Sequence, residues 1–276
     1  MPKYPSPLLA ISLLAALASP AAGQAQEVRL RGDYVASLGF LSVGSGSWDL
    51  RIAPSGFSVR GHGHTAGLVR LFDSGHGEAS AAGGMRDTTP VPATYDTTIV
   101  KRDKPSAVHI RLRNGNVTDV AFEPPPRPSR KPPDPKFVPL DPGHREGVFD
   151  PISAVLMAND DPAGIGPGAC ARSLHVFDGS MRYDLHFHFL RIEQVKTETG
   201  YQGPVAVCAV HFNPLGGYLP ERPAIKYLMG LTTMEAWLAP IAGTRFLVPW
   251  RLVIPTPFGT GTLEAERFVV SHTNNP

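Results

Sequence analysis

The stretch GSMRYDLHFHFLRIEQVKTETG, from Gly179 to Gly200, carries the clearest secondary-structure signal in the sequence. From residue 181 onward, large apolar residues alternate with polar ones. The apolar set is Met181, Tyr183, Leu185, Phe187 and Phe189, and the polar set is Arg182, Asp184, His186 and His188. Because side chains alternate between the two faces of a strand, this pattern predicts a long β-strand with one buried face.

The same period-two pattern extends outward from this stretch over most of the chain. Residues Val28 to Gly63 read as three strands separated by Gly-Ser and Pro-Ser-Gly turns. Further strands are expected at 94–102, 107–113, 116–122, 173–178, 181–196, 205–212, 232–238, 245–254 and 261–270, and an Asn-Gly turn joins the second and third of these as a hairpin. Short helices are expected at Thr65 to Phe72 and at Pro151 to Ala158, where Asp150 provides a capping side chain.

Glycine and proline, 28 and 29 residues of 276, punctuate the chain in a way that favours many short strands over long helices. We therefore predict a mainly β protein, with a curved antiparallel sheet or open barrel that runs through both halves of residues 26–276. The segment 123–147 has nine prolines and cannot form a helix or a central strand. We interpret it as a long surface loop of a single domain; a boundary between two domains is the alternative.

The first 25 residues have the order of a secretory signal peptide: Lys3, an apolar run from Leu8 to Ala18, and then small residues. The apolar run is too short to span a bilayer, which takes about 20 residues, so we expect a periplasmic protein without a transmembrane segment. Lys and Arg number 26 against 24 Asp and Glu, and this balance argues against nucleic acid as a partner.

Two cysteines, Cys170 and Cys208, lie at or beside predicted strands. In an oxidising compartment, an even number of cysteines favours a disulfide, which we expect here. A reactive cysteine nucleophile is the alternative.

Histidines suggest a second possibility, a metal site. His186, His188 and Glu193, with His211 from a later strand, approach the ligand pattern of the cupin barrels, but the spacing departs from it. A polar strand face explains these residues without any metal. His62, His64, His76 and Glu78, expected in turns around the first helix, are a weaker metal candidate. The sequence has no motif typical of a catalytic triad, a phosphate loop or a zinc protease, and we expect no cofactor.

The C-terminal half resembles a known family. The segments are DPISAVL (150–156), VFDGSMRYDL (176–185), HFNPLGGYLPER (211–222), KYLMGLTTMEAWLAPI (226–241) and LVPWRLVIPTPFGTGTLEAERF (247–268). Together they are similar to exported proteobacterial envelope proteins of domain-of-unknown-function family 3108, over about Leu30 to Val270. The resemblance implies a strongly curved antiparallel sheet, akin to the half-barrels of periplasmic lipoprotein carriers. It implies no known reaction and no catalytic residues.

Two classes of function follow. The first is a non-catalytic envelope protein that binds a lipid, a lipoprotein or an outer-membrane partner through apolar residues, with Tyr183, Phe187, Trp237 and Trp250 as candidates. The second is a cupin-like metal-binding protein or metal-dependent enzyme that uses His186, His188, Glu193 and His211.

Overall fold

The structure is a computed structural model that describes residues 27–66, 75–127, 134–159, 161 and 164–273. Its strands are β1 (Glu27–Leu38), β2 (Leu41–Ala53), β3 (Gly56–Thr65), β4 (Gly75–Arg86), β5 (Thr89–Lys101), β6 (Lys104–Arg113), β7 (Asn116–Glu123), β8 (Met157–Ala158), β9 (Arg172–Phe177), β10 (Arg182–Lys196), β11 (Thr199–Gly200), β12 (Gln202–Gly216), β13 (Met234–Pro240), β14 (Phe246–Thr256) and β15 (Gly259–Thr273). Its helices are the 3-10 turns η2 (Pro142–Arg145), η3 (Ser153–Val155) and η4 (Pro167–Ala169) and the α-helix α1 (Pro223–Met229).

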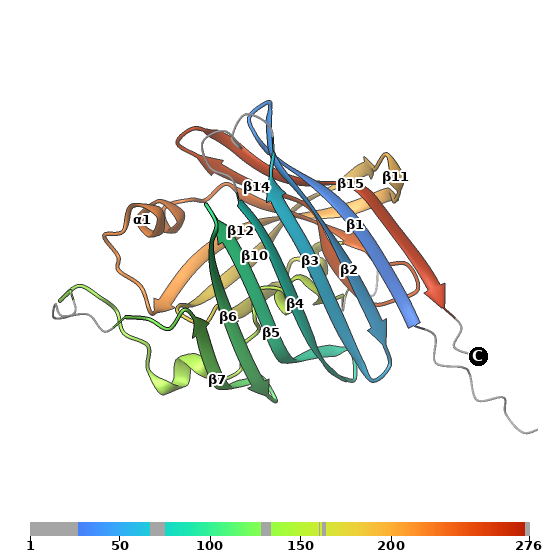
Figure 1. Ribbon diagram of the computed structural model, residues 1–276. Coiled ribbons are helices and arrows are strands. Elements are labelled where there is room, and N and C mark those ends of the chain that lie inside the picture. Colours follow the sequence, from blue (N-terminus) through green and yellow to red (C-terminus); the bar gives the residue numbers. More distant parts are fainter. Residues whose placement is uncertain (1–26, 67–74, 128–133, 160, 162–163, 274–276) are drawn as a thin grey trace, which may run out of the picture.

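All these strands belong to one sheet, in which nearly every neighbouring pair is antiparallel. Figure 1 shows β1 to β7 side by side, in chain order, as a continuous meander. Beyond β1 the order continues as β15, β14, β13, β12, β10 and β9. The last strand in the sequence, β15, thus lies between β1 and β14. The prediction of one mainly antiparallel sheet through both halves of the chain is therefore confirmed.

The β6–β7 hairpin has the predicted Asn-Gly turn. Asn114 and Gly115 have φ values of +54° and +79°, the left-handed conformation that this two-residue turn requires. Across the turn, Arg113 pairs with Asn116. The sequence thus determines this hairpin locally.

The chain between β7 and β9 folds back onto the sheet and joins its two ends. Val138 pairs with Tyr218, Val148 donates a backbone hydrogen bond to Gly115 at 2.8 Å, and Phe149 pairs with Val176 of β9. The described part of the Pro-rich segment thus lies against the sheet and connects its two edge strands, β7 and β9. Its assignment to a single domain with residues 26–276 stays a prediction.

Residues 150–158, called the plug below, lie against the inner face of the sheet, which is the face that carries Leu30, Leu50 and Val59. Leu156 of the plug belongs to the same buried cluster as these three residues. Asp150 caps the turn as expected: its Oδ1 accepts hydrogen bonds from the backbone N–H groups of Ile152 at 3.0 Å and Ser153 at 2.8 Å. The plug thus links the sheet core to the Pro-rich connection.

The helix predicted over Pro151 to Ala158 is wrong in kind and extent. The chain makes only the 3-10 turn η3, and β8 then pairs with β14. Buried packing of Leu156 and Met157 and pairing with β14 outweigh the local helix signal. In the region of the other predicted helix, Thr65 ends β3 and residues 67–72 lie outside the described residues. The α-helix α1 falls in a segment, Glu221 to Gly230, whose sequence pattern is ambiguous.

Candidate functional site

A cavity of about 310 Å³ lies between the plug and the inner face of the sheet. Ile152 and Val155 of the plug border it on one side. The sheet supplies the rest of the wall: Tyr34, Gly46, Ser47, Trp48, Gly61, His62, Gly63, Gly77, Glu78, Ala79, Thr97, Pro249, Leu252 and Leu263. The cavity therefore borders on seven strands: β1 to β5, β14 and β15.

Glycines from three neighbouring strands form the floor of this cavity. Gly46 of β2 pairs with Gly63 of β3, and Gly63 pairs in turn with Gly77 of β4. These glycines lie on the inner face, because they are an even number of residues from Leu50, Val59 and Ala81 of the same strands. A row without side chains leaves open the space that apolar side chains fill elsewhere in the sheet.

The backbone does not require glycine at Gly61 or Gly63. A Cβ atom added at Gly61 would come no closer than 3.4 Å to its neighbours, and one at Gly63 no closer than 3.5 Å. Gly83 of β4 differs, since a Cβ there would lie 2.1 Å from the carbonyl oxygen of Val91. Glycine at positions 61 and 63 is thus explained by the space that it leaves.

Two aromatic residues form one side of the cavity. The hydroxyl of Tyr34 donates a hydrogen bond to the carbonyl oxygen of Pro249 at 2.6 Å, and its ring meets that of Trp48 edge-on at 5.9 Å. Burial raises the pKa of Tyr34 well above its usual range, so this wall is uncharged at neutral pH.

Three polar residues that border the cavity, Ser47, His62 and Glu78, belong to the opposite face of the same strands. Ser47 and His62 hydrogen-bond each other there, with 3.1 Å between Oγ and Nε2, and His62 pairs with Glu78 across β3 and β4. The metal candidate of the first half is thus a set of cross-strand pairs: His64 pairs with His76 in the same way. The expectation that these residues lie in turns around a helix is wrong, because β4 begins at Gly75 and takes up His76 and Glu78.

The second set of metal candidates lies on β10 and β12. His186 and His211 are directly opposite each other, and His186 Nδ1 is 2.8 Å from the hydroxyl of Ser173. Glu193 lies past an irregularity in the pairing and forms an ion pair with Arg191 at 2.7 Å. Among the residues that the structure describes, no group of three or more His, Cys, Asp or Glu is placed to hold a metal ion.

The four predicted ligand-binding residues lie in packed clusters and are not among the residues that line the cavity. Phe187 and Trp250 are buried in two different core clusters, and the half-buried ring of Tyr183 packs 5.3 Å from that of Phe212. Trp237 is half-buried, with the guanidinium groups of Arg191 and Arg251 at 5.4 and 5.1 Å from its ring. Ligand binding by these four residues stays a prediction.

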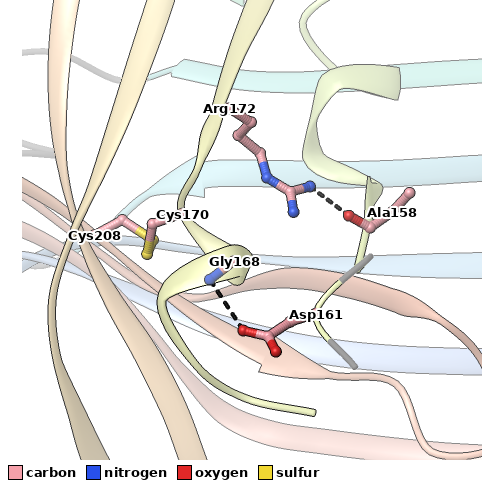
Figure 2. Close-up of a disulfide and its surroundings, with 6 residues drawn as sticks. All are labelled: Ala158, Asp161, Gly168, Cys170, Arg172 and Cys208. Carbon is pink, nitrogen blue, oxygen red and sulfur yellow. Dashed lines mark hydrogen bonds between the residues drawn. A yellow bond between two sulfur atoms is a disulfide. The ribbon is translucent and has the colours of Figure 1, made fainter. Parts of the chain in front are cut away.

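Cys170 and Cys208 are joined by a disulfide, as expected. Their Cα atoms are 5.6 Å apart and both residues are fully buried. Figure 2 shows how the loop before β9 is fixed near this bond: Arg172 donates to the carbonyl of Ala158 at 2.6 Å, and the N–H of Gly168 donates to Asp161 at 2.9 Å. The disulfide therefore attaches the chain that follows the plug to β12, the third strand from the β9 edge of the sheet.

Comparison with known families assigns the chain. The model of a family described as "Protein of unknown function (DUF3108)" matches residues 33–266. The chain belongs to the DUF3108 family. The match extends over the strands that line the cavity, the plug and both cysteines, so the whole arrangement described above lies within the DUF3108 region.

Among solved structures, this DUF3108 protein is similar to a beta-barrel-like protein of domain of unknown function DUF1849 from Brucella abortus. The identity is 8%, the alignment covers 88% of this chain and 98% of the other, and the TM-score is 0.48. No protein with a curated description matches the sequence significantly. Within the described residues, no helix is long and apolar enough to cross a membrane.

The sequence contained a signal for the cavity that a search for reactive residues misses. Three successive segments carry Gly-x-Gly: Gly44 to Gly46, Gly61 to Gly63 and Gly75 to Gly77. In strands, this spacing puts both glycines of each segment on one face. His62 and His76, which stand between the glycines of the second and third segments, draw attention as possible metal ligands, but the glycines face the interior.

Proposed function

We propose that this protein is a non-catalytic protein of the cell envelope that holds an apolar group, the acyl chain of a lipid or lipoprotein, in the cavity between the plug and β1 to β5. The observation that carries the proposal is the cavity itself, with its glycine floor and its uncharged aromatic side. Ligand pockets range from roughly 300 to 1,000 Å³ and are lined mainly by apolar side chains. At about 310 Å³, this cavity has the size of a small one.

The lining of the cavity favours an acyl chain over a polar ligand. The glycine row crosses three strands, and the apolar residues Ile152, Leu252 and Leu263 stand around it. An acyl chain needs no hydrogen-bond partners, and a wall of glycine, aliphatic and aromatic groups supplies contact without specific polar recognition. The signal-peptide pattern of residues 1–25 supports a place in the periplasm, where lipids and lipoproteins are both available as ligands.

A fluorescent fatty acid with a conjugated polyene chain tests the proposal. Bound in the cavity, it should quench Trp48 by energy transfer and become fluorescent itself, with saturation at one molecule per protein. The variant Gly61→Leu puts a side chain into the cavity and should weaken binding at least tenfold. Arg60→Leu places the same side chain on the opposite face of the same strand, at a residue outside the cavity wall, and should bind like the parent.

Equal probe binding by the parent and Gly61→Leu would contradict the proposal, provided that circular dichroism shows both proteins to be folded. Metal-dependent turnover of a substrate by the parent protein would favour the enzyme class instead.

A further inference from the structure

Two hairpin turns at one end of the molecule each expose a phenylalanine. Phe40, in the β1–β2 turn, is 94% exposed, and Phe258, in the β14–β15 turn, is 86% exposed. Both turns lie at the upper end of the molecule as drawn in Figure 1. Such exposure is unusual for the largest apolar side chains, since folding normally removes them from water.

The two turns are fixed side by side. The backbone N–H of Gly39 donates to the carbonyl oxygen of Thr260 at 2.8 Å, and β1 and β15 are paired up to Leu38 and Gly261. Three further exposed apolar residues stand on the same strands close to the turns: Leu41, Ile254 and Leu263. We call these three, with Phe40 and Phe258, the tip surface. Its aromatic side chains are presented by a rigid frame of four paired strands.

Neither of the two hairpins that form the tip surface has a charged residue near its turn. Between Asp33 and Asp49 there is no Asp, Glu, Lys, Arg or His, and the same holds between Arg251 and Glu264. The rim of a protein–protein interface is polar and is rich in charged side chains. Two hairpin turns without charged side chains suit a partner whose interior is apolar, such as a lipid bilayer.

Two hydrogen bonds pair polar groups within the β14–β15 turn. The N–H of Phe258 donates to the hydroxyl of Thr256 at 3.2 Å, and that hydroxyl donates to the carbonyl oxygen of Gly259 at 2.7 Å. In hydrocarbon, each unsatisfied backbone group is costly, so a segment that enters a membrane must provide such partners itself. The turn provides such partners for the N–H of Phe258 and the carbonyl of Gly259.

We propose that the tip surface inserts into the interfacial region of a lipid bilayer, with Phe40 and Phe258 as the anchors. Aromatic side chains are favoured at the boundary between headgroups and acyl chains. Tyr34, Gly46 and Leu252 of the same strands line the cavity, so insertion brings the cavity close to the membrane surface. The insertion does not depend on whether the cavity holds a ligand.

A tryptophan at the tip reports the insertion directly. In Phe258→Trp, vesicles of phosphatidylethanolamine and phosphatidylglycerol should shift the added emission to shorter wavelength, and lipids brominated on the acyl chain should quench it. Phe137→Trp is the matched control: Phe137 is 42% exposed but belongs to the Pro-rich segment, and its added emission should not change. Both signals are read as differences from the parent, which has three tryptophans of its own.

Removal of the anchors gives the second measurement. Phe40→Ser in Phe258→Trp should reduce quenching by brominated lipid at least fivefold at equal vesicle concentration. Gly61→Leu in the same background should leave it unchanged, and this separates failure of the cavity proposal from failure of the membrane proposal. Equal quenching at positions 137 and 258, or no emission shift at 258 with vesicles, overturns the insertion. A shift that requires an added protein partner in place of vesicles also overturns it.

Discussion

Strands β2, β3 and β4 have two ends that differ in what they place on the inner face. At one end the paired row consists of Leu50, Val59 and Ala81; four residues further along each strand, the paired row consists of Gly46, Gly63 and Gly77. The first row is buried in the core, and the second is the floor of the cavity. One stretch of sheet thus provides both a packed core and an open space. The backbone leaves room for a Cβ at Gly61 and Gly63, whereas a Cβ at Gly46 would lie 2.7 Å from the carbonyl oxygen of His62.

This contrast separates stability from binding. Burial of apolar area supplies most of the free energy of folding, so substitutions at the packed end and in the clusters joined to it should be costly. Substitutions at Gly61 and Gly63, where a Cβ has room, should affect stability little and binding strongly. The predictions below test this separation with the free energy of unfolding in urea.

Loss of the disulfide should have the largest effect. Cys170 and Cys208 are 38 residues apart in the sequence, and in the chain-entropy model a loop of this length contributes about 4 kcal/mol. We expect the double variant Cys170→Ala/Cys208→Ala to lose stability of this order. A loss below about 1 kcal/mol would mean that the loop before β9 is held mainly by its other contacts.

Leu50→Ala should cost about 3 kcal/mol, since Leu-to-Ala changes in a core remove contacts and leave a cavity. Leu50 is fully buried in the packed row. Its control is Leu41→Ala on the same strand, where the side chain is exposed and the change should be small. Similar losses for the two variants would contradict the distinction between the two ends.

Gly83→Ala should cost about 2 kcal/mol, as is typical for an added group that forces the surroundings to move. A Cβ at this position meets the carbonyl of Val91 and also lies 2.9 Å from the ring of Phe57. Glycine at the packed end thus allows two strands and an aromatic ring to come close. Unchanged stability of Gly83→Ala would show that the strands separate there without strain.

Asp150 provides a pH-dependent test of how the plug is held. Burial raises the pKa of this carboxyl, although hydrogen bonds from Ser153 and Ile152 oppose the shift. The folded protein therefore binds this proton more tightly than the unfolded chain, whose Asp has a pKa of about 3.9. The contribution of this group to stability is fully present below that value and is lost as pH rises through the folded-state pKa.

Asp150→Asn keeps the capping oxygen but removes the titration. The difference in unfolding free energy, parent minus variant, should therefore decrease between pH 4 and pH 7. A difference that stays constant over this range would show that Asp150 does not titrate in the way its burial predicts.

Gly61→Ala should have the smallest effect on stability. The added methyl group has room, and replacing glycine reduces the freedom of the unfolded chain, so we expect a gain of about 0.5 kcal/mol. Destabilisation of the size expected for Gly83→Ala would show that both glycines serve close packing, and the comparison of the two ends would fail.

Much of the sheet could be predicted from the sequence because its signals are local. The alternation in Gly179 to Gly200 gives β10, the Asn-Gly pair gives the β6–β7 turn, and the two cysteines give the disulfide. The strand β4 was missed because seven of the twelve residues of Gly75–Arg86 are glycine or alanine, which have little intrinsic preference for strands. Pairing with β3 and β5 decides its conformation.

The cavity could not be predicted in the same way, because it depends on register. A single Gly-x-Gly is unremarkable, and only the alignment of Gly46, Gly63 and Gly77 across three strands opens a space. The plug was mispredicted for a related reason: the capped start at Asp150 is a local signal, whereas pairing of Phe246 with Ala158 brings together residues far apart in the chain. Such long-range contacts are not visible in a short window of sequence.

The position of β15 determines the order in which the protein can be completed. This strand pairs with β1 on one side and β14 on the other, and Glu27 meets Thr273. During synthesis, the first seven strands can pair with one another as they emerge, but β1 keeps one unpaired edge until residues 259–273 have been made. Contacts between such distant parts of a chain form slowly. A nascent chain therefore exposes this sheet edge from the completion of β1 until residues 259–273 have been made, and in that interval the unpaired strand is prone to join another molecule.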